Sequence, residues 1–118
     1  MFNLPKAFRT WYNWLMSEKP KLLLVEDDPF MTSLMAEAFK ADGFEVILAN
    51  DGEAAVQQAR DANPAVAVMD ILLPKKNGIE ALREIRALPR GADLPVIILS
   101  NLEDASYVTD AQKLGVKA

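Results

Sequence analysis

The chain of 118 residues contains no cysteine and no histidine. Without them there can be no disulfide bond, no thiol chemistry, no histidine-activated nucleophile and no zinc site of the usual kind. No apolar run approaches the ~20 residues that span a bilayer, and none has the length of a signal peptide core. Any chemistry must therefore use carboxylates, hydroxyls, lysines or a bound metal, and we expect a cytoplasmic protein.

The remaining composition is that of a single ordinary globular domain. Hydrophobic residues make up 51% of the chain and charged residues 25%, which allows one core of useful size. The formal net charge of −4 argues against a general affinity for nucleic acid, because such affinity depends on basic side chains. There are no internal repeats and no low-complexity tracts.

Short apolar runs alternate with helical patterns from residue 21 onward. We expect strands at residues 21–25, 44–48, 65–70 and 94–99, and helices at residues 29–41, 52–63, 78–87 and 103–114. Strands that alternate with helices through short loops form βαβ units. The sequence therefore predicts a parallel sheet covered by helices.

Capping residues and apolar spacing define these helices further. Asp28 followed by Pro29 predicts a helix start, because Asp accepts hydrogen bonds from the first turn and Pro has no N–H to satisfy. Gly43 and Gly115 are expected to end the first and last helices. Spacing predicts that the first helix buries an apolar stripe of Phe30, Met31, Leu34, Met35, Ala38 and Phe39. The third helix is predicted to face inward with Ile79, Leu82 and Ile85.

Acidic residues directly follow two of the predicted strands. Glu26, Asp27 and Asp28 come after the apolar run at residues 22–25, and Asp70 follows the run at residues 65–69. The carboxyl ends of parallel strands meet at one edge of a sheet, where ligands bind. Clustered carboxylates stay ionised together only beside a cation, and an all-oxygen set suits Mg²⁺. Asp28 is better explained as the helix cap than as a ligand.

Three sequence motifs at strand ends carry a family resemblance. LLLVEDDP, VMDILLPKKNG and VIILSN occur in the order and spacing that are typical of the response-regulator receiver domain of bacterial two-component signalling. GVKA near the end resembles the loop before the fifth strand of that family. The resemblance covers residues 21–118 and implies a flavodoxin-like, doubly wound α/β fold with strand order 2-1-3-4.

The resemblance also implies a role for each matching residue. Asp70 would be the phosphoacceptor, taking a phosphoryl group from a histidine kinase or a phosphotransfer protein. The Mg²⁺ ligands would be Asp27, Asp70, the backbone carbonyl of Leu72 and, through water, Glu26. Ser100 would be the switch hydroxyl that bonds the phosphoryl group, and Pro74 and Gly78 would shape the loop after the phosphoacceptor.

The function implied is signalling rather than enzymatic turnover. A receiver passes its state to a downstream protein through contacts, and nothing here predicts direct binding of nucleic acid or membrane. A small phosphohydrolase with an aspartate nucleophile is disfavoured, because such enzymes need a second acid two residues later and Leu72 stands there.

The chain ends where the family continues. After Ala118 we would expect a fifth strand, a lysine that pairs with the phosphoryl group, and a fifth helix, so these are predicted to be missing. The apolar strand at residues 94–99 would then form an open edge that invites pairing. The alternative reading is a truncated or engineered receiver that acts as a non-switching scaffold or oligomerisation module.

An added segment precedes the receiver. Residues 1–16 are predicted to form an amphipathic helix with Leu4, Phe8, Trp11 and Leu15 on one face, joined by a linker at residues 17–20 to the domain at residues 21–118. We expect the helix to pack on protein, either on the open edge of its own sheet or in a homodimer. Only two cations lie on its polar face, which disfavours a membrane surface. A vector-derived segment is the simpler alternative.

Overall fold

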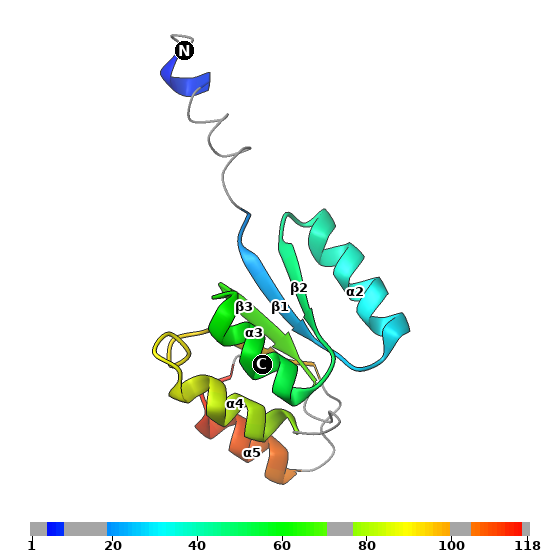
Figure 1. The fold of residues 1–118 in the computed structure, drawn as a ribbon, viewed down its shortest axis with the longest axis vertical. Helices are drawn as coiled ribbons and strands as arrows, with labels where there is room; N and C mark the ends of the chain where they lie inside the picture. Colours follow the sequence, from blue (N-terminus) through cyan, green and yellow to red (C-terminus); the bar gives the residue numbers. More distant parts are fainter. Residues whose placement is uncertain (1–4, 9–18, 71–76, 100–104, 117–118) are drawn as a thin grey trace.

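The computed structural model describes residues 5–8, 19–70, 77–99 and 105–116 (Figure 1). Within them, strands and helices alternate along the chain as the sequence predicts. The elements are β1 (Lys21–Val25), α2 (Pro29–Ala41), β2 (Glu45–Ala49), α3 (Gly52–Asp61), β3 (Val66–Met69), α4 (Gly78–Ala87), β4 (Val96–Ile98) and α5 (Ala105–Lys113).

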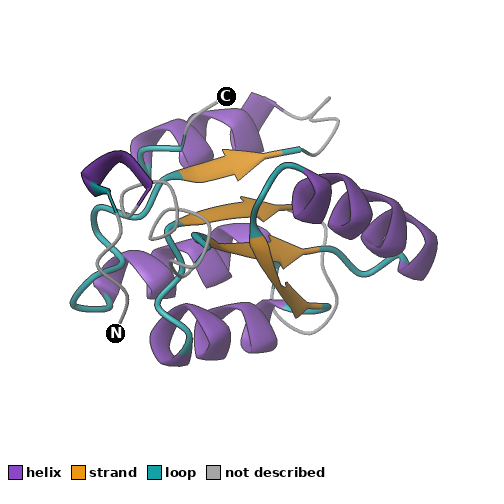
Figure 2. Ribbon diagram, turned by 90° about the horizontal axis from the view of Figure 1, so that it is seen from above, coloured by secondary structure: helices purple, strands orange, loops and turns teal. Residues whose placement is uncertain are grey.

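The four strands form one parallel sheet in the order β2-β1-β3-β4, which confirms the predicted topology. Leu23 of β1 lies between Ile47 of β2 and Ala67 of β3, and Ala67 pairs in turn with Val96 of β4. Helices lie on both sides of the strands (Figure 2). The central strands are therefore buried on both faces, which is why they read as continuous apolar runs.

Alternate residues of each strand serve two separate cores. One face packs against α3 and α4 in a cluster that includes Leu23, Val25, Ala55, Val56, Ala67, Met69, Leu82, Ile85 and Val96. The opposite face packs against α2 through Leu22, Leu24, Ala36, Val68 and partly buried neighbours. The inward prediction for α4 is confirmed, since Ile79 is 4% exposed and Leu82 and Ile85 are 0% exposed. Each such side chain contributes about 1.5–3 kcal/mol by leaving water.

The predicted stripe of α2 is wrong for four of its six members. Phe30 is 73% exposed, Leu34 55% and Met31 38%, and Ala38 is exposed as well. The buried side of α2 instead runs through Ala36, with Met35 and Phe39 packed around it. The six apolar positions span too wide an arc of the helix surface to be buried together. Only those that face the sheet are packed against it, and the others are exposed to solvent.

Several strand and helix ends differ from the prediction by a few residues. β2 lies one residue later than expected, and β3 is two residues shorter. β4 covers three residues instead of six. Its start is late because Pro95 has no N–H to donate, although the Pro95 carbonyl accepts a hydrogen bond from the N–H of Ala67 at 2.9 Å. α3 ends at Asp61, and Asn63 adopts a φ of 51°, a left-handed conformation that Asn tolerates.

Side-chain caps fix the starts of three helices. The Asp28 carboxylate accepts hydrogen bonds from the N–H groups of the first turn of α2, which confirms its predicted role, and Asp51 caps α3 in the same way. Asn77 caps α4 by accepting from the N–H of Glu80 at 2.9 Å, and this cap was not predicted. At the other ends, Gly43 takes a φ of 101° after α2, as the prediction of a helix end requires.

Of the predicted amino-terminal helix, the structure describes residues 5–8 only. Residues 6–8 are helical, and Phe8 is 44% exposed, so this side chain is not part of either core of the domain. The other residues of the predicted stripe lie outside the described residues. In the part of the chain that the structure describes, no helix has the length and apolar character needed to cross a bilayer.

Candidate metal centre

Parallel pairing of β1 with β3 brings the acidic residues together. Val25 and Met69 are register partners at the ends of these strands, and the backbone N–H of Asp70 donates to the carbonyl of Val25 at 3.0 Å. On the other side of β1, the N–H of Glu26 donates to the carbonyl of Ala49 at 3.1 Å. The backbone positions of Glu26 and Asp70 are thus set by hydrogen bonds of the sheet.

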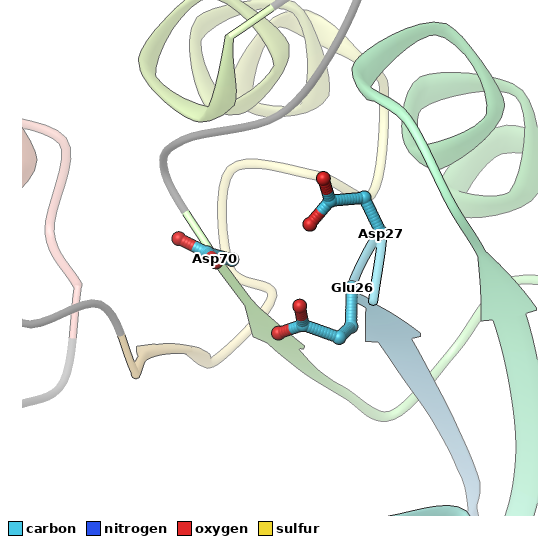
Figure 3. A group of neighbouring side chains, drawn as sticks. All are labelled: Glu26, Asp27 and Asp70. Atoms are coloured by element: carbon cyan, nitrogen blue, oxygen red, sulfur yellow. The ribbon is translucent and has the colours of Figure 1, made fainter. Parts of the chain in front are cut away.

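Glu26, Asp27 and Asp70 form one carboxylate cluster at this edge (Figure 3). One carboxylate oxygen from each residue lies within 4.8 Å of the other two. Glu26 and Asp70 are half-buried, whereas Asp27 is exposed. The strand-end prediction for these three residues therefore holds as geometry, and the cluster is accessible from solvent.

The cluster is electrostatically unfavourable for Glu26. Burial raises the pKa of the Glu26 carboxyl, the negative charges of Asp70 and Asp27 raise it further, and the hydrogen bond from the N–H of Asp28 lowers it. That N–H donates to Glu26 Oε1 at 3.2 Å. Because the rise prevails, this edge favours either a proton on Glu26 or a cation among the three oxygens.

Two residues beside the cluster have structural roles. Asp28 uses Oδ1 to cap α2, accepting from the N–H of Phe30 at 2.9 Å, so its carboxylate is engaged away from the cluster. Thr32, in the first turn of α2, donates its hydroxyl to the carbonyl of Glu26 at 3.3 Å. The contact of Thr32 was not predicted, although a hydroxyl one turn after a helix cap is well placed to reach back to the preceding loop.

The donors present fit a hard divalent cation. Three carboxylates within a few ångströms supply oxygen ligands and excess negative charge, and Mg²⁺ takes one or two carboxylates while keeping several waters. Gly78, the remaining described residue of the predicted site, is buried at the start of α4. Leu72, Pro74 and Ser100 lie outside the described residues, so their predicted roles stay predictions.

An open cleft of about 440 Å³ adjoins the carboxylates. Glu26 and Asp27 form one wall, and Thr32 and Ser33 of α2 together with Asn50 before α3 contribute polar groups. Leu48 and Ala49 of β2 also line the cleft, so it lies between the start of α2 and the end of β2.

Comparisons with known proteins agree with this architecture. The model of the response regulator receiver domain family matches residues 22–118. The chain is 41% identical over 80 residues to the transcriptional regulatory protein CpxR of Escherichia coli, which covers 68% of this chain and 33% of CpxR. It is 34% identical over 98 residues to the chemotaxis protein CheY of Bacillus subtilis, which covers 82% of this chain and 80% of CheY.

A solved structure matches in both sequence and shape. The receiver domain of sensor histidine kinase PA1611 from Pseudomonas aeruginosa superposes with a TM-score of 0.76 at 30% identity, covering 86% of this chain and 82% of that one. That structure has a magnesium ion coordinated in its active site cleft. The chain spans about a third of the length of the CpxR proteins that it matches. With the family model matching most of the sequence, the chain belongs to the response regulator receiver domain family of two-component signalling.

Proposed function

We propose that Asp70 accepts a phosphoryl group from a histidine kinase or a phosphotransfer protein, and that the domain then signals through protein contacts. The observation that carries this proposal is the carboxylate cluster, in which Asp70 lies with Glu26 and Asp27 at the carboxyl edge of the sheet. A single aspartate at a strand end, without the other two carboxylates, would not indicate a phosphoacceptor site. Family membership supports the same assignment.

The chemistry requires one displacement at phosphorus. A carboxylate oxygen of Asp70 attacks the phosphorus of a phosphohistidine, the P–N bond breaks, and the imidazole nitrogen leaves with the bonding electron pair. The product is an aspartyl phosphate, a mixed anhydride reactive enough to be transient. Such transfers depend on alignment and on compensation of charge on the phosphoryl oxygens, and that compensation is what a bound Mg²⁺ supplies.

The residues proposed to hold the metal are those predicted from the sequence. Asp27 and Asp70 would ligate directly, Glu26 would act through water, and the carbonyl of Leu72 would complete the protein ligands. The half-buried, charge-crowded position of Glu26 supports this, because a cation would relieve its repulsion. Ser100 would donate its hydroxyl to the phosphoryl group.

We further propose that the domain is a stoichiometric acceptor rather than an enzyme. A phosphohydrolase of the aspartate type needs an acid two residues after the nucleophile to protonate the leaving group and activate water. Leu72 occupies that position and can do neither.

Exposed apolar side chains beside the site support docking of a protein donor. Phe30 and Leu34 lie on the solvent side of α2 at 73% and 55% exposure, one turn apart, and α2 begins directly after the acidic loop. Contiguous exposed apolar surface, unlike scattered single side chains, marks interaction sites. A kinase that contacts them would bring its phosphohistidine close to Asp70.

The rival candidate is a receiver that no longer switches and serves as a scaffold. One measurement separates the two: incubation with acetyl phosphate and Mg²⁺, followed by intact-protein mass spectrometry. We expect a gain of one phosphoryl group that is abolished in Asp70→Asn and retained in Asp42→Asn, an exposed aspartate at the other end of α2. A native protein that gains no mass, or a gain that survives Asp70→Asn, would remove the proposal.

A further inference from the structure

Arg86, in the last turn of α4, donates hydrogen bonds to backbone carbonyls of two separate segments. Its Nη1 donates to the carbonyls of Gly91 and Leu94 in the α4–β4 loop, at 2.7 Å and 2.5 Å. Its Nε donates to the carbonyl of Leu114 at 2.8 Å, and Nη2 to that of Gly115 at 3.4 Å. One guanidinium thus joins this loop to the end of α5.

The loop side of this contact is set by Gly91. The chain turns back on the end of α4 so closely that a Cβ at this position would lie 1.6 Å from the carbonyl oxygen of Ile85. The N–H of Gly91 donates to the carbonyl of Leu88 at 3.0 Å, and the N–H of Leu94 donates to the carbonyl of Gly91 at 3.4 Å. The loop is therefore a compact turn whose carbonyls have a fixed place beside Arg86.

On the α5 side, Arg86 contacts the carboxyl-terminal end of the helix, where the last carbonyls have no partner within the helix. Gly115 has a φ of 74°, its N–H donates to Gln112, and the N–H of Val116 donates back to Ala111, which is the Schellman arrangement of a helix terminus. The last carbonyls of a helix have no partner within the helix and carry its negative dipole end. The guanidinium supplies donors and positive charge to the carbonyls of Leu114 and Gly115.

Apolar packing holds the same end of α5. Ala111 is 2% exposed and forms a small cluster with Ile79 of α4, to which Ile98, Leu114 and Val116 add partly buried side chains. Both the hydrogen bonds of Arg86 and this cluster therefore fasten the carboxyl end of α5 to α4 and the sheet.

The other end of α5 lies at the functional edge. β4 ends at Ile98, whose register partner Met69 directly precedes Asp70, and the chain runs from there to the start of α5 at Ala105. A helix of nine residues is about 13 Å long, and its far end contacts Arg86 beside the loop that leads into β4, so the two ends of α5 lie at opposite edges of the sheet. Figure 1 shows α4 and α5 side by side along this length.

We propose that Arg86 makes the carboxyl end of α5 a fixed pivot, about which the amino-terminal end of the helix turns when Asp70 is phosphorylated. This inference rests on the proposed function. A guanidinium can hold both segments because its five donors spread in a rigid plane, whereas a single ammonium cannot bridge them. Arg86 is a positioning residue, since it acts through the backbone of α5 and not on the phosphoryl group.

The first arm of the test uses unphosphorylated protein and amide hydrogen exchange by NMR. Arg86→Gln should raise exchange at least tenfold at Leu114, Gly115 and Val116, because hydrogen bonds from a charged donor are among the stronger ones. Arg86→Lys should give an intermediate rise and protects the test against a variant that folds poorly. The matched control is Arg83→Gln, which alters an exposed arginine on the same helix and should change nothing there. Unchanged exchange in both Arg86 variants would overturn the inference.

The second arm adds acetyl phosphate and Mg²⁺ and records the mass first. In the phosphorylated native protein, amides in the first half of α5 should change exchange more than threefold, while Gly115 and Val116 stay within experimental error. In Arg86→Gln the change should extend to these two residues. Equal changes at both ends of native α5 would overturn the pivot. A native protein that gains no mass refutes the proposed function and the pivot with it, and the first arm then still reports whether Arg86 clamps the helix end.

Discussion

Replacing Glu26 with Gln should stabilise the metal-free protein. The side chain keeps nearly the same shape, and Gln Oε1 can still accept the hydrogen bond that the N–H of Asp28 donates at 3.2 Å. The substitution removes one negative charge from a group of three whose oxygens lie within 4.8 Å of one another. Unlike most substitutions at a half-buried position, it should therefore raise the free energy of unfolding.

The size of this gain follows from Coulomb's law. Two unit charges 4.8 Å apart repel by about 0.9 kcal/mol in a water-like dielectric, which suits a cluster that contains the exposed Asp27. Glu26 faces two such charges, so Glu26→Gln should gain about 1–2 kcal/mol. For a chain of this length that corresponds to a rise in Tm of about 4–8 °C. Sodium chloride at 1 M should shrink the gain, because it reduces the screening length from about 8 Å to about 3 Å.

Thermal unfolding followed by circular dichroism in EDTA at pH 7 measures the effect. Glu37→Gln, at an exposed glutamate on α2, is the matched control and should change Tm by less than about 2 °C. Adding Mg²⁺ should narrow the difference, since a ligand at ten times its Kd stabilises the native protein by about 1.4 kcal/mol. A Glu26→Gln protein that melts at or below the native temperature in EDTA would refute the idea that the cluster is strained by charge.

Three further predictions concern the same edge. Because the pKa of Glu26 is raised from 4.5, the folded protein binds the proton more tightly than the unfolded chain, so native stability in EDTA should fall as pH rises through the window above 4.5, while urea unfolding of Glu26→Gln shows no such loss from this group. Asp27→Asn should abolish most Mg²⁺ binding measured by titration calorimetry, whereas Asp28→Asn should leave it nearly intact. Equal losses of Mg²⁺ affinity would contradict the assignment of Asp27 as the ligand and Asp28 as the helix cap. If Leu72 shields the aspartyl phosphate from water, Leu72→Asn should shorten the lifetime of phosphorylated Asp70 several-fold in a mass-spectrometric time course, and an unchanged lifetime would dispose of the shielding role.

The position of the carboxylate cluster could be predicted because it depends on topology alone. Parallel strands end at the same edge, so acids that follow two neighbouring strands must meet there. The prediction needed only the apolar runs before Glu26 and Asp70 and the rule that consecutive βαβ units give parallel strands. The structure adds the register, in which Val25 pairs with Met69 and the acidic residues that follow them therefore lie side by side.

The orientation of α2 could not be predicted, because its sequence has no clear polar face. Apolar residues at most positions of the helix leave the angle of burial undetermined. The sheet fixes that angle by burying Ala36, and Thr32 turns toward the domain because its hydroxyl reaches the carbonyl of Glu26. Phe30 and Leu34 are left in solvent beside the site, although their spacing predicts that they are buried.

Two features of the structure, the cap at Asn77 and the contacts of Arg86, were not predicted from the sequence, for different reasons. The cap at Asn77 could have been found, because Asn three residues before Glu80 is a common helix-start pattern. The contacts of Arg86 could not, because its hydrogen bonds in the described part of the chain go to backbone carbonyls, which every residue carries and no sequence pattern marks. Only the turn forced by Gly91 and the end of α5 bring those carbonyls to one place.

The two edges of the sheet differ in how their charges are balanced, and this difference suits a switch. At the carboxyl edge, three carboxylates repel one another and burial raises the pKa of Glu26, so a bound cation lowers this repulsion and added negative charge on Asp70 increases it. At the opposite edge, the charge of Arg86 is met by four carbonyl oxygens, and adding or removing charge near Asp70 barely alters that balance at the distance of a helix length. An input at the first edge can therefore displace the nearby end of α5 while its far end stays bound. If neither end of α5 were held, the same input could shift the whole helix instead of turning it about one end. The hydrogen bonds of Arg86 to the end of α5 therefore matter for the signal as well as for stability.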